Sequence, residues 1–515
     1  MLSSGVVKWF INRKLKNYDW LKKRGEADLL ETINKLLPPP RFVTKPMLHQ
    51  LVCFIIAVYR KNFLFLLDLG TGKTKIILDA LYYWIFSGEI TRALVLVPNR
   101  INIIGWMDEV KKHQPSMKIV LLPNNVELRE ARLAAPFDIA VCTYAGFQTM
   151  CGTVTKHKRE IDPKKLTDIA RHFQCVVYDE CHNLKNHRSI NYKVAYLLQP
   201  LMKYRYGLTG TPFGRNVADL WAQFRVIDDG KTLGRTLTLF RQAFFESKVN
   251  FFGGWEYKLR EDRTELLWET IKNRSILYDA DDCSDLPPCI RRRLRLPFPE
   301  ETRVYYSRIL KILKNNRKDR RVVENMFIRM RQISSGFLTM LPEHDDGIRK
   351  TIEFMDNPKL DALMEMFDDV GEHNKIVVFH EFTWSGNRIA QELKAKKIKF
   401  AKLDGHTKNP EKEYRKFKTD PKCRGFIINS KAGGTGTNLQ EARYLVYYES
   451  PTSPIIRRQT EKRVHRTGQT KKTFIIDLVV RNTADARILS FIKQGNDLRE
   501  AVLRGKFQLA DLFNQ

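Results

Sequence analysis

Short apolar runs of strand length, separated by segments of helical period, constrain the fold of this chain more than any other feature. The first set of runs lies at 63–68, 93–98, 138–144 and 175–180, and the second at 375–381, 424–430, 444–450 and 473–480. Segments of helical period lie between them, for example at 73–86 and 384–397. Continuous apolar strands that alternate with helices are typical of parallel sheets covered on both faces. We therefore predict an α/β fold with two parallel-sheet lobes.

The domain organisation follows from the length and from a change of composition between the two sets of strands. A chain of 515 residues is too long for one hydrophobic core. The middle is richer in charged and aromatic residues, which favours a mostly helical insertion there. We predict a basic N-terminal extension at 1–45, a first lobe at 46–285 with an insertion after 225, an extended crossing segment and helical protrusion at 286–355, and a second lobe with C-terminal helices at 356–515.

The charge balance indicates the class of partner. Lys and Arg number 89 against 58 Asp and Glu, which leaves a net charge of +31. A field of this sign attracts polyanions, so nucleic acid is the first candidate, ahead of an acidic membrane surface or acidic proteins. The basic and aromatic N-terminal extension could dock on nucleic acid, or could pack its aromatic side chains on the first lobe.

The cysteines and the lengths of the apolar runs indicate the cellular compartment of the protein. The eight cysteines form no CxxC pair and no zinc-like spacing, so we expect buried free thiols in a reducing compartment. No apolar run reaches the length of a membrane span, and the N-terminus has no signal-peptide pattern. We expect a soluble protein of the cytoplasm or nucleoid, or of a host cell if the chain is viral, that is not secreted.

A glycine-rich turn between strand 63–68 and the next helix is the strongest phosphate-binding signal. Its residues are Gly70, Thr71, Gly72, Lys73 and Thr74. Backbone N–H groups at a helix N-terminus cradle phosphates, while Lys73 would neutralise them and Thr74 would hold Mg²⁺. Leu67 occupies the first glycine position of the strict P-loop pattern. A tight turn with an exposed lysine therefore stays open as the alternative.

The pair Asp179 and Glu180 follows the apolar strand 175–180, at the end of a strand where open α/β sheets bind ligands. Asp179 would hold Mg²⁺, and Glu180 would orient and deprotonate an attacking water. Two solvated loop acids are the alternative, which we disfavour because the pair ends a buried strand of the same lobe as Lys73.

Further motifs resemble a known family. DECH, GTGKT and LTGTP at 208–212 are similar to motifs of superfamily 2 helicase-like ATPases. The segment SKAGGTGTNLQEARYLVYYESPTSP and the later QTEKRVHRTGQ resemble the Swi/Snf-type DNA translocases, of a compact phage, viral or prokaryotic type. MRQISSGF at 330–337, NPKLDAL at 357–363 and LDGHT at 403–407 also match. The resemblance covers about 46–490 and implies two RecA-like lobes with helical insertions, ATP between them and DNA across both.

The resemblance also implies residue roles. Gln50 would read the adenine, and Gly434 and Gly436 would let the backbone approach phosphate. Four residues would couple the nucleotide state to DNA: His182, Thr209, Thr211 and Gln459. Arg463 and Arg466 would be the arginine fingers. If the basic run 457–472 is helical, Gln459, Arg463 and Arg466 share one face and Gly468 ends the helix.

Candidate DNA contacts are polar residues in loops at strand ends: Asn99, Arg100, Thr143, Tyr144, Ser430 and Lys431, with the segment 380–382. Contacts to the DNA backbone suit an enzyme that moves along any sequence. Among the other basic residues of the 457–472 run, we expect Arg457, Lys462, Lys471 and Lys472 to be solvated or near DNA.

The chain departs from the family pattern at three places. The phosphate motif is DLGTGKT rather than DEMGLGKT, Thr452 to Pro454 replace a Trp-Asn-Pro, and Lys462 stands where an Asp is usual. We expect an ATPase of the helicase-like type that acts as a monomer with ATP and Mg²⁺. It would translocate on double-stranded DNA, with branched or single-stranded DNA as alternative partners, and would remodel DNA or protein–DNA complexes. A strand-separating or branch-migrating DNA or RNA helicase, and a nucleic-acid-binding scaffold with weak ATPase activity, are the alternatives.

Overall fold

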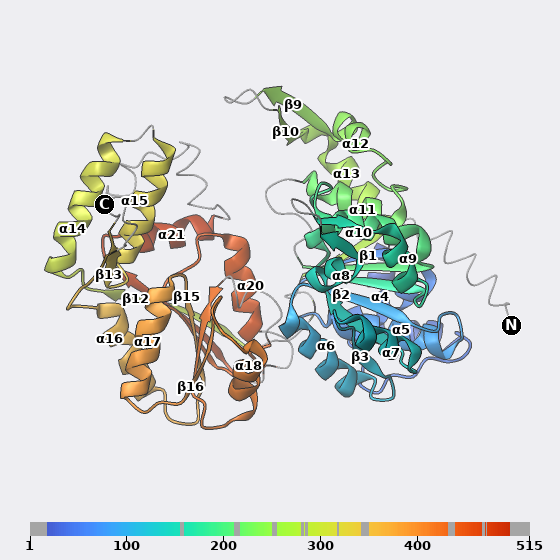
Figure 1. Cartoon of the computed structure of the whole chain (residues 1–515), viewed down its shortest axis with the longest axis horizontal. Helices are drawn as coiled ribbons and strands as arrows, with labels where there is room; N and C mark the ends of the chain where they lie inside the picture. Colours follow the sequence, from blue (N-terminus) through green and yellow to red (C-terminus); the bar gives the residue numbers. More distant parts are fainter. Residues whose placement is uncertain are drawn as a thin grey trace. The chain divides into compact units, whose positions relative to one another are not determined.

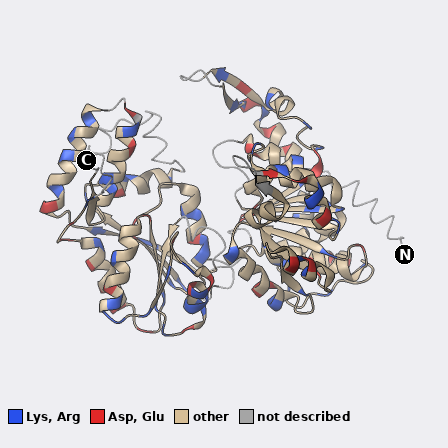
Figure 2. Cartoon of the chain, viewed as in Figure 1, with Lys and Arg blue, Asp and Glu red and all other residues tan. Residues whose placement is uncertain are grey.

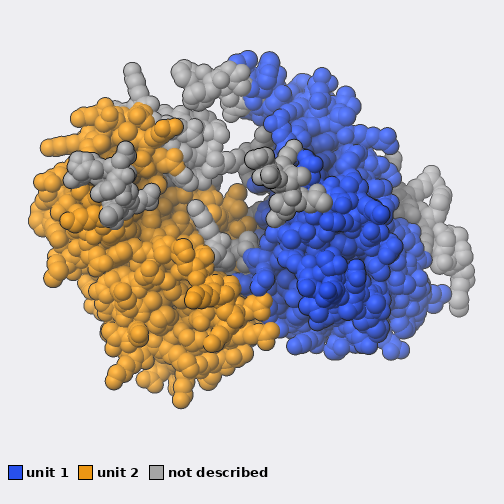
Figure 3. Space-filling view, in the orientation of Figure 1, with its two compact units in different colours: residues 1–285 blue, residues 286–515 orange. Residues whose placement is uncertain are grey.

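The structure is a computed structural model, and the chain divides into two compact units, residues 1–285 and 286–515 (Figures 1 and 3). The described residues are 18–68, 70–154, 159–210, 217–249, 255–279, 283, 287–316, 319–340, 350–430, 438–465, 469 and 471–494.

A seven-stranded sheet forms the centre of the first unit, in the order β11-β1-β8-β7-β2-β4-β3, and neighbouring strands in this order run parallel. Its strands are β1 (Asn62–Leu67), β2 (Ala93–Val97), β3 (Ile119–Leu121), β4 (Ile139–Thr143), β7 (Cys175–Asp179), β8 (Tyr204–Thr209) and β11 (Ser275–Tyr278). The inner strands are buried along nearly all their length because helices cover both faces.

The helices of the first unit separate into two apolar clusters, one on each face of the sheet. They are α2 (Asp19–Lys22), α3 (Glu26–Asn34), α4 (Leu48–Tyr59), α5 (Lys73–Phe86), α6 (Arg100–His113), α7 (Val126–Ala134), α8 (Tyr144–Cys151), α9 (Pro163–Ala170), α10 (Ile190–Leu198), α11 (Asp219–Asp228), α12 (Leu237–Phe244) and α13 (Thr264–Lys272). Two antiparallel pairs, β5 (Gly152–Val154) with β6 (Arg159–Ile161) and β9 (Phe245–Val249) with β10 (Trp255–Leu259), complete the unit.

The described part of the N-terminal extension packs on the first sheet. Tyr18 is buried, its ring meets that of Phe63 edge-on at 5.2 Å between centroids, and its hydroxyl donates to the Asn273 carbonyl at 3.1 Å. Leu21 of α2 is also buried in the same cluster. For residues from 18 onward, packing on the lobe is therefore the observed arrangement.

The second unit is built on a six-stranded parallel sheet in the order β12-β19-β18-β15-β17-β16. Its strands are β12 (Cys289–Leu296), β15 (Ile376–His380), β16 (Phe400–Leu403), β17 (Gly425–Asn429), β18 (Tyr444–Tyr447) and β19 (Thr473–Val480). The segment expected to cross between lobes thus contains β12, an edge strand that pairs with β19 over its whole length. Its arginines are exposed, as an edge position allows.

Helices cover the second sheet and extend beyond it (Figure 1). They are α14 (Glu300–Asn315), α15 (Arg320–Ile333), α16 (Pro358–Asp369), α17 (Thr383–Ala395), α18 (Pro410–Thr419), α20 (Pro454–Val464) and α21 (Ala484–Lys493). The helices α14 and α15 share an apolar cluster with α21, and β13 (Phe337–Thr339) pairs with β14 (Thr351–Glu353) beside them.

Two parallel sheets with apolar strands and covering helices confirm the predicted α/β fold of two RecA-like lobes. All eight cysteines are free thiols, and six of them are buried. None of the helices within the described ranges has the length and hydropathy needed to cross a bilayer.

Candidate functional site

The turn between β1 and α5 depends on glycines with left-handed backbone. Gly70 and Gly72 have φ values of 88° and 79°, a region that costs other residues conformational energy. Gly72 is also the N-cap residue of α5, and a Cβ at this position would lie 2.3 Å from Nε2 of Gln50. Both conformation and space therefore require glycine here, which brings the turn close to the helix N-terminus as a phosphate cradle needs.

Helix α4 supports this turn from the side. Gln50 Nε2 donates to the Thr71 carbonyl at 3.2 Å, and His49 Nε2 donates to the same oxygen at 2.7 Å. Burial lowers the pKa of His49, so the neutral ring is favoured, although the hydrogen bond to Thr71 opposes the shift. The Thr71 hydroxyl in turn donates to the Asp68 carbonyl at 2.9 Å. Gln50 thus holds the loop, and its contact with adenine stays a prediction.

Lys73 is the first residue of α5 and is buried, with 9% of its surface exposed. Its Nζ lies 3.7 Å from Oε1 of Glu180 and makes no hydrogen bond to any described residue. A buried ammonium without hydrogen-bond partners is costly, and an anionic ligand would supply them. The alternative of an exposed lysine is therefore wrong, and the residue fits a bound phosphate. Thr74 follows Lys73 on α5 and is half-buried.

Asp179 ends β7 and is held by three hydrogen bonds. Its Oδ2 accepts from Trp106 Nε1 at 3.1 Å, its Oδ1 accepts from the Glu180 backbone N–H at 3.0 Å, and its carbonyl accepts from the Tyr144 hydroxyl at 2.9 Å. Burial, followed by repulsion from Glu180, raises the pKa of Asp179, while Lys73 opposes the rise. A divalent cation would relieve this repulsion, so the carboxylate fits the role proposed for it with Mg²⁺.

Glu180 is buried with a left-handed backbone, φ 49° and ψ 56°, which is uncommon for a residue with a side chain. Its carboxylate lies 3.3 Å from His182 Nδ1 and accepts from the Thr209 hydroxyl at 3.4 Å. His182 Nδ1 and Thr209 Oγ1 are themselves 3.1 Å apart. The ends of β7 and β8 thus bring together Lys73, Glu180, His182 and Thr209 as predicted, and the alternative of two solvated acids is wrong.

Three contacts of this site were not foreseen. Trp106 of α6 and Tyr144 of α8 both bind Asp179, and His49 of α4 binds the phosphate loop. Trp106 lies 73 residues before Asp179, and Tyr144 lies 35 residues before it. No local sequence pattern links such positions, because the parallel sheet alone brings β2, β4 and β7 side by side.

In the second unit, helix α20 carries Gln459, which is half-buried, and Arg463, which is buried. The helix ends at Val464 rather than at Gly468 as expected, because His465 leaves the helical conformation and its Nε2 donates to the Pro287 carbonyl at 2.8 Å. Five predicted positions lie outside the described residues: Thr211, Lys431, Gly434, Gly436 and Arg466.

Arg457 was expected to be solvated or near DNA, and that expectation is wrong because its side chain is buried. Its guanidinium is buried, pairs with both carboxylate oxygens of Asp477 at 2.5 and 2.9 Å, and donates from Nε to Glu461 at 2.6 Å. It also lies 3.6 Å from the ring centroid of Tyr447. Burial alone would lower the pKa of Arg457, but these partners raise it. The charge anchors α20 on β18 and β19, whereas Lys471 and Lys472 are exposed as expected.

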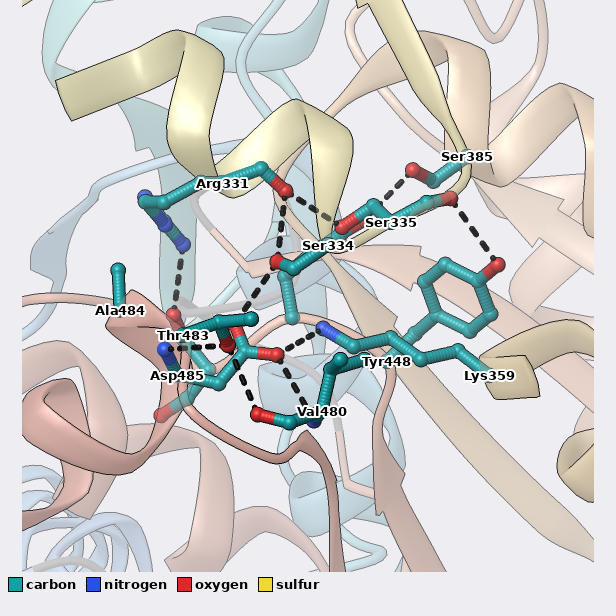
Figure 4. A network of polar contacts seen from close by, with 12 residues as sticks. Arg331, Ser334, Ser335, Lys359, Ser385, Tyr448, Val480, Thr483, Ala484 and Asp485 are labelled. Carbon is teal, nitrogen blue, oxygen red and sulfur yellow. Dashed lines mark hydrogen bonds and ion pairs between the residues drawn. The ribbon is translucent and has the colours of Figure 1, made fainter. Parts of the chain in front are cut away.

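A second polar network joins motifs that are distant in the sequence (Figure 4). Asp485 of α21 pairs with the fully buried Lys359 of α16 at 2.7 Å and accepts from the Ser334 hydroxyl at 3.1 Å. Arg331 of α15 donates to the Ser450 carbonyl at 2.8 Å, and the Ser450 hydroxyl accepts from Arg457 at 3.0 Å. The segments 330–337 and 357–363 therefore meet in one buried network that reaches the start of α20.

The candidate DNA contacts differ in exposure. Asn99 and Thr143 cap the N-termini of α6 and α8 through their side chains. Tyr144 and Ser430 are buried, so their side chains do not lie on the surface that DNA could reach. Arg100 is exposed at the start of α6 and remains a candidate.

Comparisons with known proteins agree with the motifs. The SNF2-related domain matches residues 6–343, and the helicase conserved C-terminal domain matches residues 358–468. The chain is 24% identical over 473 residues to the transcription regulatory protein SNF2 of Saccharomyces cerevisiae, covering 85% of this chain and 26% of that protein. It is 23% identical over 445 residues to the uncharacterized ATP-dependent helicase MG018 of Mycoplasma genitalium, covering 85% of this chain and 40% of that protein.

Among solved structures, the SWI2/SNF2 ATPase core of Sulfolobus solfataricus in complex with dsDNA covers 93% of this chain, with 98% of its own length matched, 21% identity and a TM-score of 0.40. The chain spans about a quarter to two fifths of the length of the two curated relatives named above. The match to residues 6–343 covers well over half of the chain, which confirms the resemblance: the chain belongs to the SNF2-related domain family.

Proposed function

We propose that this chain is a DNA-dependent ATPase that converts ATP to ADP and phosphate and uses the reaction to translocate along double-stranded DNA. The buried Lys73, with no hydrogen-bond partner among the described residues and a glycine turn around it, is the observation that carries the proposal. Membership of the SNF2-related family supports it.

The first unit supplies the groups for hydrolysis. The N–H groups of the turn at 70–74 and the Lys73 ammonium bind and orient the phosphates. Thr74 and Asp179 are the residues that we propose for Mg²⁺, which neutralises charge on phosphate oxygens when it is bound. Glu180 accepts a proton from the water that attacks the γ-phosphorus, and His182 and Thr209 hold its carboxylate in place.

The second unit supplies the proposed coupling and finger residues. Gln459 and Arg463 lie on α20, whose position on the sheet is set by Arg457 and Asp477. Arg463, with Arg466, would stabilise the charge that develops on the transferred phosphoryl group. One chain therefore carries both the phosphate-binding lysine and the finger arginines, which supports a monomer as the active form.

The DNA partner follows from charge and family. The net charge of +31 favours a polyanion, and Arg100 offers an exposed cation at the strand-end edge of the first unit. We propose that the chain remodels DNA or protein–DNA complexes in the cytoplasm or nucleoid, or in a host cell if it is viral. The chromatin-remodelling names of longer relatives belong to those proteins.

ATPase assays with duplex DNA, single-stranded DNA and RNA, beside a strand-displacement assay, test the proposal. We expect the strongest stimulation by duplex DNA and no strand displacement. Arg463→Ala should reduce turnover about 10³-fold if the finger role holds. Stimulation by RNA alone, or turnover that no nucleic acid changes, would contradict the proposal.

A further inference from the structure

A lysine-lined groove lies on the second unit along the edge strand β16, with lining residues from α17 and α18, and no part of the proposed ATP site contributes to it. Its volume is about 920 Å³. Figure 2 shows blue basic segments near the end of α17 and on α18. Six lysines line the groove: Lys394, Lys397, Lys399, Lys402, Lys408 and Lys416. Its floor is β16, the strand at the end of the described sheet.

The acidic residues of the lining do not offset this charge. Asp404 and Glu413 are the lining carboxylates. Asp404 pairs with Lys402 at 2.9 Å and accepts from the His406 backbone N–H at 3.0 Å, and Glu413 accepts from the Lys402 backbone N–H at 3.1 Å. Both carboxylates therefore bind groups of the groove lining itself, and the groove presents a net positive surface to a ligand.

Three of the lysines are available to a ligand. Lys399 pairs with Asp420 at 2.5 Å, and Lys416 donates to the Phe400 carbonyl at 2.5 Å. By contrast, Lys394, Lys397 and Lys408 are exposed, and no hydrogen bond or ion pair of their side chains is found within the described part of the chain. Lys394 lies on α17, Lys397 lies before β16 and Lys408 lies after it, so the three charges are spread along the groove.

A peptide ligand fits this groove poorly. An extended peptide gains affinity by pairing with the main chain of an edge strand. Along β16, the Lys402 N–H is already bound by Glu413, and the Phe400 carbonyl by Lys416. Carboxylate recognition also favours the planar fork of arginine, and the lining contains lysine but no arginine. The occupied edge and the cation type therefore both disfavour an acidic peptide.

Lysine as a mobile point charge suits a phosphodiester backbone that is bound without sequence preference. The floor adds the half-buried ring of Phe400, and grooves for single-stranded nucleic acid combine lysines with aromatic rings. The bases of a single strand are free to stack on this ring, whereas the bases of a duplex are already stacked inside the double helix. We propose that this groove binds a single-stranded DNA segment, such as a tail that continues from a duplex.

The test is equilibrium binding by fluorescence anisotropy, without nucleotide, at several salt concentrations. The probes are a blunt DNA duplex and the same duplex with an oligothymidine tail. Wild-type protein should bind the tailed probe more tightly. The variant Lys394→Ala/Lys397→Ala/Lys408→Ala should lose that gain, about tenfold in affinity. Its salt slope for the tailed probe should fall by about 2, because each phosphate that a lysine neutralises on a single strand adds roughly 0.7 to the slope.

A matched control removes the same amount of charge elsewhere on the unit. Lys311 and Lys314 of α14 and Lys412 of α18 are exposed and do not line the groove. The variant Lys311→Ala/Lys314→Ala/Lys412→Ala should keep the preference for the tailed probe. Thermal melting of both variants verifies that they are folded.

Four results would overturn the proposal: no preference of the wild type for the tail, a preference that survives in the groove variant, an equal loss for the blunt duplex, or competition by polyglutamate as strong as that by oligothymidine. The last result would assign the groove to acidic peptides. Because no nucleotide is present, failure here leaves the proposed ATPase function to its own assay.

Discussion

Two buried cations, Lys73 in the first unit and Arg457 in the second, are held in opposite ways. Lys73 has one carboxylate at 3.7 Å and no hydrogen bond to a described residue. Arg457 has two carboxylate partners, a serine hydroxyl and an aromatic ring around it. A cation whose three nitrogens all donate to side chains of the fold fixes a helix, whereas one with no hydrogen bond to the described part of the fold can bind a ligand. The difference separates a structural charge from a functional one when both are buried.

The largest expected effect is on Lys73. Lys73→Ala should reduce ATP turnover about 10³-fold, because it removes the charge that meets the phosphates. It should change the melting temperature little, because the loss of an incompletely paired buried ammonium is offset by the loss of the positive charge beside the buried carboxylates Asp179 and Glu180. Steady-state ATPase rates and thermal melts measure both. Lys193→Ala, at an exposed lysine of α10, is the control. A large fall in the melting temperature of Lys73→Ala would show that Lys73, like Arg457, stabilises the fold.

Arg457 should show the reverse pattern. Arg457→Asp leaves a buried carboxylate facing Asp477, so we expect the free energy of unfolding to fall by about 3–5 kcal/mol. The charge-swapped variant Arg457→Asp/Asp477→Arg restores opposite charges and should recover much of that loss. Urea unfolding measures each variant. Additive losses in the double variant would show that the pair does not hold α20.

Gly72 comes directly before Lys73, and its left-handed backbone shapes the turn that places the Lys73 ammonium. Gly72→Ala should lower the free energy of unfolding by about 1–2 kcal/mol from the left-handed φ alone, and should weaken ATP binding because Gln50 must move. Urea unfolding and nucleotide titration measure the two effects. The double variant Gly72→Ala/Gln50→Ala removes the clash and keeps the strain. If the double variant recovers full stability, glycine is needed at position 72 to leave room for Gln50 and not for its left-handed backbone.

Trp106 tests whether a hydrogen bond to Asp179, the carboxylate near Lys73, contributes to turnover. Trp106→Phe keeps the ring and removes the donor to Asp179, so we expect turnover to fall about tenfold, the equivalent of one hydrogen bond to a charged group. The Mg²⁺ concentration needed for half-maximal rate should rise as well. An unchanged dependence on Mg²⁺ would mean that Trp106 serves packing alone.

The smallest effect concerns pH. Burial opposes ionisation of Glu461, but Arg457 and Arg291 outweigh it and lower its pKa. The resulting stabilisation is present above the ordinary glutamate pKa of about 4.3 and is lost as the pH falls through the lowered value. Glu461→Gln should therefore be less stable than wild type by about 1 kcal/mol at neutral pH, with a difference that shrinks in acid. Urea unfolding across this pH range measures it, and a constant difference would contradict the linkage.

The sequence predicted the buried strands well, and the edge strands poorly. The apolar runs at 63–68 and 473–480 coincide with β1 and β19 because a strand covered on both faces needs continuous apolar side chains. By contrast, β12 mixes arginines with apolar residues, and its partner lies far along the chain. Such a strand is visible only once the sheet that it joins is known.

The functional residues also differ in how well the sequence predicts them, depending on whether their partners are local. Lys73, Asp179 and Glu180, which the structure brings close together, could be predicted as one site because each motif is local and its chemistry requires those residue types. Arg457 was misjudged because its partner Asp477 lies 20 residues later on another strand. Local charge patterns predict that a residue is basic, and the tertiary fold decides whether it is solvated.

The pairing of β12 with β19 has a mechanical consequence. The chain enters the second unit through β12, and that strand is bonded in parallel along eight residues to the last strand of the same sheet. When a pull is directed along β12 at Cys289, the hydrogen bonds between the two strands bear the load together, in shear, instead of opening one after another. The first strand of the second unit can therefore bear such a pull without peeling away from the sheet.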